Sequence, residues 1–140
     1  TSMDRRSFLT AAGTTAAVAL SGCLDGGLSD ADFDIGMSQN AFLPEEYEVS
    51  VGETVVWGNN GSRGHTVTAY EETIPEAAEY FASGGYDDLE TAREDWHATG
   101  GGNISPGGTY EHTFEVPGRH NYLCIPHEPS GMVGVIVVTE

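Results

Sequence analysis

Apolar and polar residues alternate with a period of two along most of the chain after residue 31. This period is typical of β-strands that pack one face into a core and turn the other to solvent. Residues 46–51 are a clear case, because Tyr47, Val49 and Val51 share one face. The pattern predicts strands at residues 32–38, 46–51, 54–57, 65–69, 110–116, 119–124 and 132–139.

Turn-forming residues separate these segments, for example Phe-Leu-Pro at 42–44 and Pro-Gly at 117–118. Residues 74–102 lack the alternation and predict a surface insertion, with helix at 75–81, a further helical turn or two in 87–97, and glycines that end each part. The chain is therefore expected to be all-β, a Greek-key β-sandwich of seven to eight strands with a partly helical insertion at about 74–102.

The length and charge of the chain narrow its class. Its 140 residues suit one folded domain. It carries 22 acidic residues against five basic ones, all arginine, and a net charge of −17 argues against a nucleic-acid partner. The acidic residues are interspersed with apolar ones, which disfavours a disordered acidic tail. A lysine-free acidic surface resembles proteins from high-salt organisms, where salt screens self-repulsion.

The first residues have the shape of an export signal. Arg5-Arg6 precedes an uncharged run that ends in Leu-Ser-Gly-Cys23, and the run is shorter than the roughly 20 apolar residues that span a bilayer. We expect a twin-arginine signal with a lipobox at 1–23, lipidation of Cys23, a flexible spacer at 24–31 and a folded domain at 32–140. The alternative is a buried helix with a stray cysteine. A disulfide to Cys124, the second cysteine, is formally allowed, but each cysteine has a better separate explanation.

Candidate metal ligands concentrate in residues 122–132. Cys124, His127 and Met132 bring a thiolate, an imidazole and a thioether into nine residues. Such a donor set suits copper alternating between Cu(I) and Cu(II), given one more imidazole. His65 is the candidate, because a Greek-key sandwich brings strands distant in sequence to the same end. The remaining histidines match no motif and are read as structural: His97, His112 and His120.

The same residues carry a family resemblance. The Cys-x2-His-x4-Met spacing of 124–132, followed by Val-Gly, resembles the copper loop of the plastocyanins, and residues 56–65 resemble the segment that holds their first histidine. The similarity covers about residues 35–140 and implies a cupredoxin-like sandwich with one type 1 (blue) copper ion. It implies His65, Cys124 and His127 as strong ligands and Met132 as a long axial one. With the N-terminal signal and the acidic composition, the chain is most similar to the halocyanins, membrane-associated blue-copper proteins of haloarchaea.

Three positions depart from the plastocyanin pattern. Thr66 stands where asparagine is usual, although its hydroxyl is able to bond to the facing loop. Gly64 stands where proline is usual, and glycine would let its carbonyl approach the copper as a weak fifth ligand, as in azurins. Leu123 stands where an aromatic residue would support an electron route through a tyrosine.

The expected function is electron transfer without enzymatic activity. The resemblance implies a monomeric carrier that shuttles single electrons between membrane redox complexes, lipid-anchored on the extracellular face. The expected transfer edge is His127, ringed by weakly charged residues: Asn40, Phe42, Gly64, Ile125 and Pro129.

A copper carrier or storage module is the alternative function, which a rigid site disfavours. Copper enzymes need further histidines beside the thiolate, where this chain has Leu123 and Ile125. A nucleophilic Cys124 would have His127 nearby as a base, but no third group to complete the arrangement.

Overall fold

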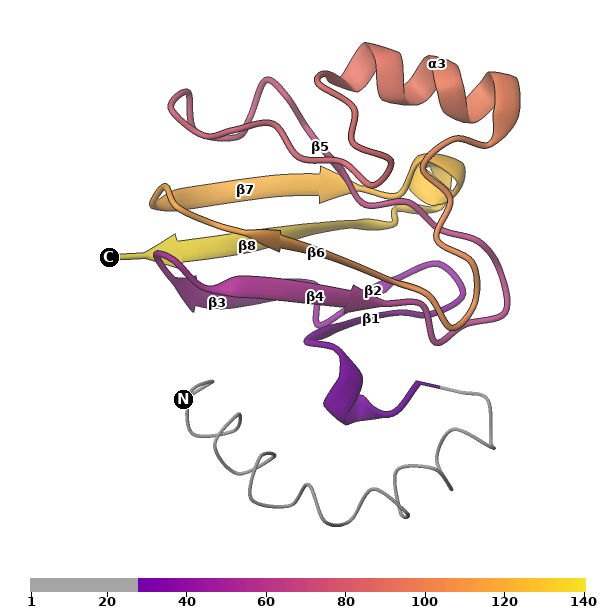
Figure 1. Cartoon of the computed structure of the whole chain (residues 1–140), viewed down its shortest axis with the longest axis horizontal. Helices are drawn as coiled ribbons and strands as arrows, with labels where there is room; N and C mark the ends of the chain where they lie inside the picture. The colour runs from indigo at the N-terminus through magenta and orange to yellow at the C-terminus, as the bar shows by residue number, and fades with distance from the viewer. Residues whose placement is uncertain (1–27) are drawn as a thin grey trace.

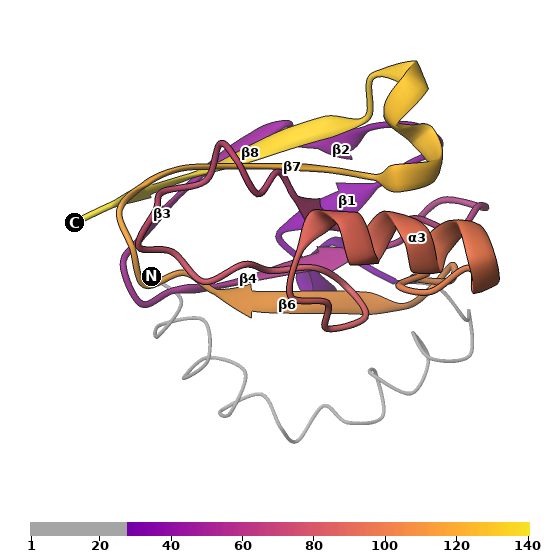
Figure 2. The same ribbon diagram turned by 90° about the horizontal axis from the view of Figure 1, so that it is seen from above.

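The computed structural model describes residues 28–140, and two four-stranded sheets packed face to face form its body (Figures 1 and 2). The sheets have the orders β2-β1-β4-β6 and β3-β8-β7-β5. The strands are β1 (Ile35–Met37), β2 (Phe42–Leu43), β3 (Glu46–Ser50), β4 (Thr54–Gly58), β5 (Thr68–Ala69), β6 (Thr109–Thr113), β7 (Gly118–Leu123) and β8 (Val133–Thr139). The all-β sandwich is confirmed. The predicted export signal at 1–23, with Cys23, and the first part of the spacer lie outside the described residues.

The strand pairings bring the candidate ligands to one end of the sandwich. β7 lies between β8 and β5, antiparallel to both, and Leu123 at its end pairs with Val133 on one side and Thr68 on the other. Cys124 therefore leaves β7 beside the start of β8 and close to the residues that precede β5. Neighbouring strands are often distant in sequence, as in the parallel pair of β3 and β8, which is the crossover expected of a Greek key.

Several strands are shorter than the alternation predicts. The first loses its beginning to a 3₁₀ turn, η2 (Asp30–Asp32), in which the Ser29 amide donates to the Asp32 carboxylate at 2.9 Å. The strand expected at 65–69 pairs regularly only from Thr68, and the one expected at 110–116 ends at Thr113. Conversely, the predicted turn at 42–44 contains β2, because buried Phe42 pairs with Met37 of β1.

Aromatic side chains fill the space between the sheets. Trp57 of β4 is fully buried, and its ring lies 5.4 Å from Tyr122, 5.6 Å from Tyr110 and 6.2 Å from both Phe81 and Phe114, measured between centroids. Cys124 and Met132 belong to the same core cluster. The candidate metal site is thus built on the end of the core, where packing restricts movement.

The insertion differs from its prediction in its first half. The helix expected at 75–81 is wrong, since these residues form turns. The reason is tertiary: Phe81 and Ser83 are buried, the Ser83 amide donates to the Val67 carbonyl at 2.7 Å, and the Ala69 amide donates to the Phe81 carbonyl at 3.0 Å. Residues 81–83 are thus a buried neighbour of β5, whereas residues 71–80 are exposed or half-buried, in agreement with the predicted surface insertion.

The second half of the insertion forms helix α3 (Leu89–Thr99), longer than predicted. Asp88 caps its start by accepting from the Thr91 amide at 2.7 Å, and Gly100 ends it in the left-handed conformation with φ of 77°. In both views α3 lies at the same end of the molecule as the 3₁₀ turn η3 (Ile125–Ser130), the segment between β7 and β8 (Figures 1 and 2). Within residues 28–140, no helix is long and apolar enough to cross a membrane.

Candidate metal centre

Three of the four predicted ligands converge at this end of the sandwich. The Cys124 sulfur lies 3.5 Å from Nδ1 of His65 and 3.4 Å from Nδ1 of His127, and one ligand atom from each of the three lies within 4.8 Å of the others. Bonds of roughly 2.0–2.3 Å to a shared first-row metal ion separate nitrogen and sulfur ligands by about 3.5 Å in near-tetrahedral geometry. The described residues therefore offer a trio with metal-binding spacing.

Backbone hydrogen bonds fix the loop that carries Cys124, His127 and Met132. The Cys124 amide donates to the Met132 carbonyl at 3.1 Å, the His127 amide to the Cys124 carbonyl at 3.2 Å, and the Met132 amide to the His127 carbonyl at 3.2 Å. Gly131 adopts φ of 91°, which favours glycine and lets the chain turn from η3 into Met132. The Met132 side chain is fully buried in the core. The backbone groups of Cys124, His127 and Met132 are thus hydrogen-bonded to one another.

His65 is fixed from a different part of the chain. It forms an antiparallel bridge with Ile104, in which the His65 amide donates at 3.2 Å and the Ile104 amide donates back at 2.7 Å. Buried Asn59 reinforces the bridge by donating to the carbonyls of Arg63 and Ile104, each at 2.7 Å. This pairing, rather than a regular strand, positions the first imidazole.

Thr66 joins the His65 segment to the loop. Its amide donates to the Cys124 sulfur at 3.4 Å, and its hydroxyl oxygen accepts from the Ile125 amide at 2.9 Å. Thr68 donates in turn to the Thr66 hydroxyl at 3.0 Å. The expected bond between Thr66 and the facing loop is present. An amide aimed at the sulfur stabilises a thiolate, and partners of this kind orient metal ligands.

Burial favours the uncharged form of each of the three ligating groups in the metal-free chain. It lowers the pKa of His65, an effect that His127 increases and the Ser38 carbonyl opposes. Burial also lowers the pKa of His127, with a further contribution from Arg63. The pKa of the Cys124 thiol is raised by burial, against the opposing amides of Thr66 and His127. Both imidazoles are therefore ready to bind, and a metal ion must displace the thiol proton.

His127 is the ligand of the trio that reaches the surface. His65 and Cys124 are fully buried, whereas His127 is half-buried and lines an open groove of about 510 Å³. The expected ring around it needs correction, because Phe42 and Ile125 are buried. Of the expected residues Gly64 does line the groove, together with Arg63, Trp96, Thr99, Gly100, Asn103, Pro106 and Pro126.

The sequence profile of copper binding proteins of the plastocyanin/azurin family matches residues 30–139. The chain belongs to this family. Among the plastocyanins it resembles, that of Oryza sativa subsp. indica is 32% identical over 137 residues, covering 96% of this chain and 80% of the relative. Plastocyanin of Vicia faba is 32% identical over 120 residues, covering 85% of this chain and 96% of the relative. Copper is accordingly the cofactor of the site, and its thiolate and imidazole donors suit that metal.

Solved structures agree on the fold. The reduced Cu(I) form of an amicyanin variant aligns with a TM-score of 0.54 at 25% identity, over 79% of this chain and 85% of that one. A copper-containing nitrite reductase from Thermus scotoductus aligns with a TM-score of 0.55 at 24% identity, but the match covers 76% of this chain and only 22% of the reductase. The second comparison concerns the fold alone.

Two departures from the plastocyanin pattern have a structural explanation. A Cβ on Gly64 would lie 2.0 Å from Oδ1 at the end of the exposed Asn103 side chain, so glycine lets this side chain lie directly against position 64. Leu123 is fully buried in a cluster with Ala92 of α3 and Ile125, so α3 covers the position at which the family usually has an aromatic residue.

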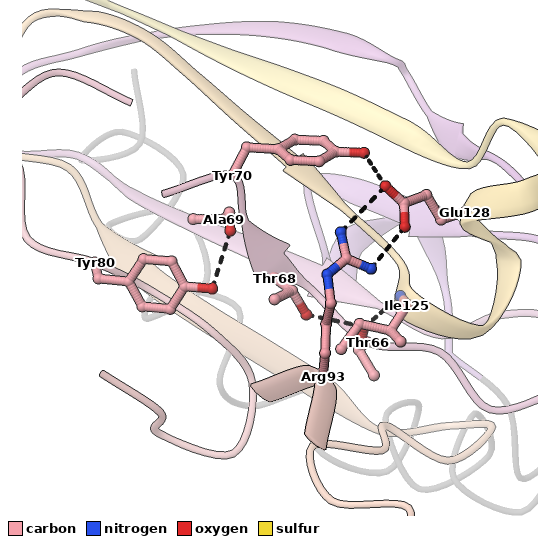
Figure 3. A network of polar contacts seen from close by, with 8 residues as sticks. All are labelled: Thr66, Thr68, Ala69, Tyr70, Tyr80, Arg93, Ile125 and Glu128. Atoms are coloured by element: carbon pink, nitrogen blue, oxygen red, sulfur yellow. Dashed lines mark hydrogen bonds and ion pairs between the residues drawn. The ribbon is translucent and has the colours of Figure 1, made fainter. Parts of the chain in front are cut away.

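Sequence reasoning missed the contacts that α3 makes with the loop. Arg93 of α3 forms a two-pronged ion pair with Glu128, at 2.8 Å and 3.3 Å, and Tyr70 donates to the same carboxylate (Figure 3). The available signal was weak: Arg93 is the single arginine between Gly64 and Gly118, where the sequence has no lysine, and Leu89, Ala92 and Trp96 recur at helical spacing. Neither pattern identifies the partner. His97, His112 and His120 do not join the ligand cluster of the described residues.

Proposed function

We propose that this protein is a type 1 copper electron carrier that shuttles single electrons between membrane redox complexes. The observation that carries the proposal is the arrangement of His65, Cys124 and His127, in which two ligands are buried and the third reaches an open groove. Copper bound there supplies a one-electron Cu(I)/Cu(II) couple. The bonded loop and the core hold the ligands in place, which keeps the rearrangement between oxidation states small.

Met132 completes the proposed ligand set as the weak axial thioether. Its buried side chain and its backbone bonds to Cys124 and His127 support this role. His127 is the proposed transfer edge, since its imidazole connects the buried site to the groove. The side of that groove formed by Trp96, Pro106 and Pro126 is weakly polar and suits close, transient contact with a partner.

A copper carrier or storage module is the competing function. Copper delivery favours open ligands that exchange readily, whereas His65 and Cys124 are fully buried here. The two functions make different predictions for the purified chain on addition of Cu(II). An electron carrier should develop intense red-region absorption from the thiolate, show narrow copper hyperfine splitting and undergo reversible one-electron reduction. Colourless or irreversibly reduced copper would support delivery instead.

Cys124→Ser tests the assignment, because it replaces the thiol with a hydroxyl of similar size. The red absorption should disappear. His65→Gln should also weaken it, whereas His97→Gln on the exposed side of α3 is the matched control and should leave it unchanged. Full absorption in Cys124→Ser would refute the ligand set.

The proposal extends to cellular placement. The Arg-Arg signal and Leu-Ser-Gly-Cys23 support export by the twin-arginine route and a lipid anchor on the extracellular face of the cell membrane. Together with the lysine-free acidic composition, they support a halocyanin-like monomeric carrier from a high-salt organism. Its electron donor and acceptor would then be membrane redox complexes within reach of a short spacer.

A further inference from the structure

We propose that Arg93, Glu128 and Tyr70 form a positioning clamp, by which helix α3 holds the copper-binding loop in its metal-ready conformation. The inference rests on the copper site of the proposed function but assigns a new role to residues that bind no metal. The clamp also gives a structural role to the insertion at 74–102, which contains α3. The three residues come from separate parts of the chain and meet at one carboxylate (Figure 3).

The geometry of the ion pair favours orientation over simple attraction. Nη1 of Arg93 lies 2.8 Å from Oε1 of Glu128 and Nη2 lies 3.3 Å from Oε2, so the guanidinium meets the carboxylate with both prongs. The Tyr70 hydroxyl donates to Oε2 from the segment that follows β5. Three donors thus fix the rotation of the Glu128 side chain.

Glu128 transmits this restraint to the ligands. It is the residue next to His127, and its carbonyl accepts from the Gly131 amide at 2.8 Å, immediately before Met132. Movement of Glu128 therefore disturbs the turn that connects two proposed ligands. A metal site needs such supporting contacts, because ligands on an unsupported loop sample geometries that do not bind.

The helix itself is well anchored. Its buried Ala92 packs in a cluster with Leu123 and Ile125, which flank Cys124. The Leu89 amide donates to the Glu71 carboxylate at 3.2 Å, and Tyr86 donates to the Asp95 carboxylate. The packing of Ala92 against Leu123 of β7 and the bond from Leu89 to Glu71 do not involve the Arg93 side chain, so the clamp can be removed without removing the helix.

Arg93→Gln removes the clamp, and Arg119→Gln is the matched control. Arg119 pairs with Glu46 at 3.5 Å through side chains that are each more than half exposed, and either substitution removes one positive charge from the same chain. Arg93→Lys restores the charge without the two-pronged geometry. The first measurement is amide hydrogen exchange of residues 124–132 in the metal-free chain. The others are copper release to a chelator and electron self-exchange in the loaded protein.

In Arg93→Gln we expect loop amides to exchange about threefold to tenfold faster. This range is that of a charge-assisted pair discounted for side chains that keep 35% and 29% of their surface exposed. Copper release should accelerate by a similar factor, because release requires the loop to open. Electron self-exchange should slow, since a looser loop rearranges more. Arg119→Gln should match the unmodified protein, and Arg93→Lys should fall between.

Unchanged loop exchange in Arg93→Gln, or an equal change in Arg119→Gln, would overturn the clamp. Acceleration spread evenly over the β-strands, or confined to α3, would also overturn it, since either would indicate only a loss of stability. The exchange experiment needs no copper. Failure of the proposed electron transfer would therefore appear in the redox measurements alone and leave the clamp result standing.

Discussion

Thr66→Val removes the hydroxyl that links the His65 segment to the metal loop and that also accepts from the Thr68 hydroxyl at 3.0 Å. Valine has nearly the shape of threonine but lacks the hydroxyl that accepts from the Ile125 amide at 2.9 Å. Both residues are buried, with 1% and 6% of their surface exposed, so water does not replace the lost acceptor. The bond from the Thr66 amide to the Cys124 sulfur belongs to the backbone and should persist.

Leaving a buried amide without a partner costs about 1–3 kcal/mol. The free energy of unfolding of Thr66→Val should fall by that amount, equivalent to roughly 4 °C in melting temperature for each kcal/mol in a domain of this size. Chemical denaturation of the metal-free chain measures the first quantity. Hydrogen exchange provides a local measure, because the Ile125 amide should exchange about 5-fold to 150-fold faster.

Thr66→Ser is the matched control, since it keeps the hydroxyl and removes a methyl group. It should lose about 1 kcal/mol of stability from the missing methyl contacts while the Ile125 amide stays protected. Equal protection of Ile125 in both variants, or a valine variant as stable as the unmodified chain, would refute the reasoning.

Two further predictions concern stability and placement. Burial lowers the pKa of His120 below its usual 6.5, so the unfolded chain binds more protons, and the stabilisation present above that pH should decline as pH falls. His120→Gln should flatten this decline in denaturation curves of the metal-free chain recorded from about pH 7 to pH 5, and an unchanged slope would exclude His120 as its source. Cys23→Ser in the full-length chain should move the protein from the membrane fraction to the soluble fraction of expressing cells, because the proposed lipid anchor is lost. Retention of the variant with membranes would contradict the anchor.

The sequence alone determined the features that depend on local spacing. Alternation with a period of two predicted most strands because each strand has one buried face, as in β4 and β7. The spacing of Cys124, His127 and Met132 identified the loop because these residues lie within one turn between two strands. His65 required one further assumption, a Greek-key arrangement, and the structure supplies the contact as a bridge to Ile104.

Only the tertiary structure decided the conformation and the contacts of the insertion at 74–102. Residues 75–81 have a helical pattern, but the pairing of residues 81–83 with residues 67–69 buries Phe81 and holds the end of this stretch beside β5, and a helix this short has little stability of its own. Similarly, Arg93 and Glu128 are 35 positions apart, and neither has a local pattern that names the other. Their contact exists because α3 packs over the end of β7. In a chain with many carboxylates, the tertiary structure decides which of them pairs with Arg93.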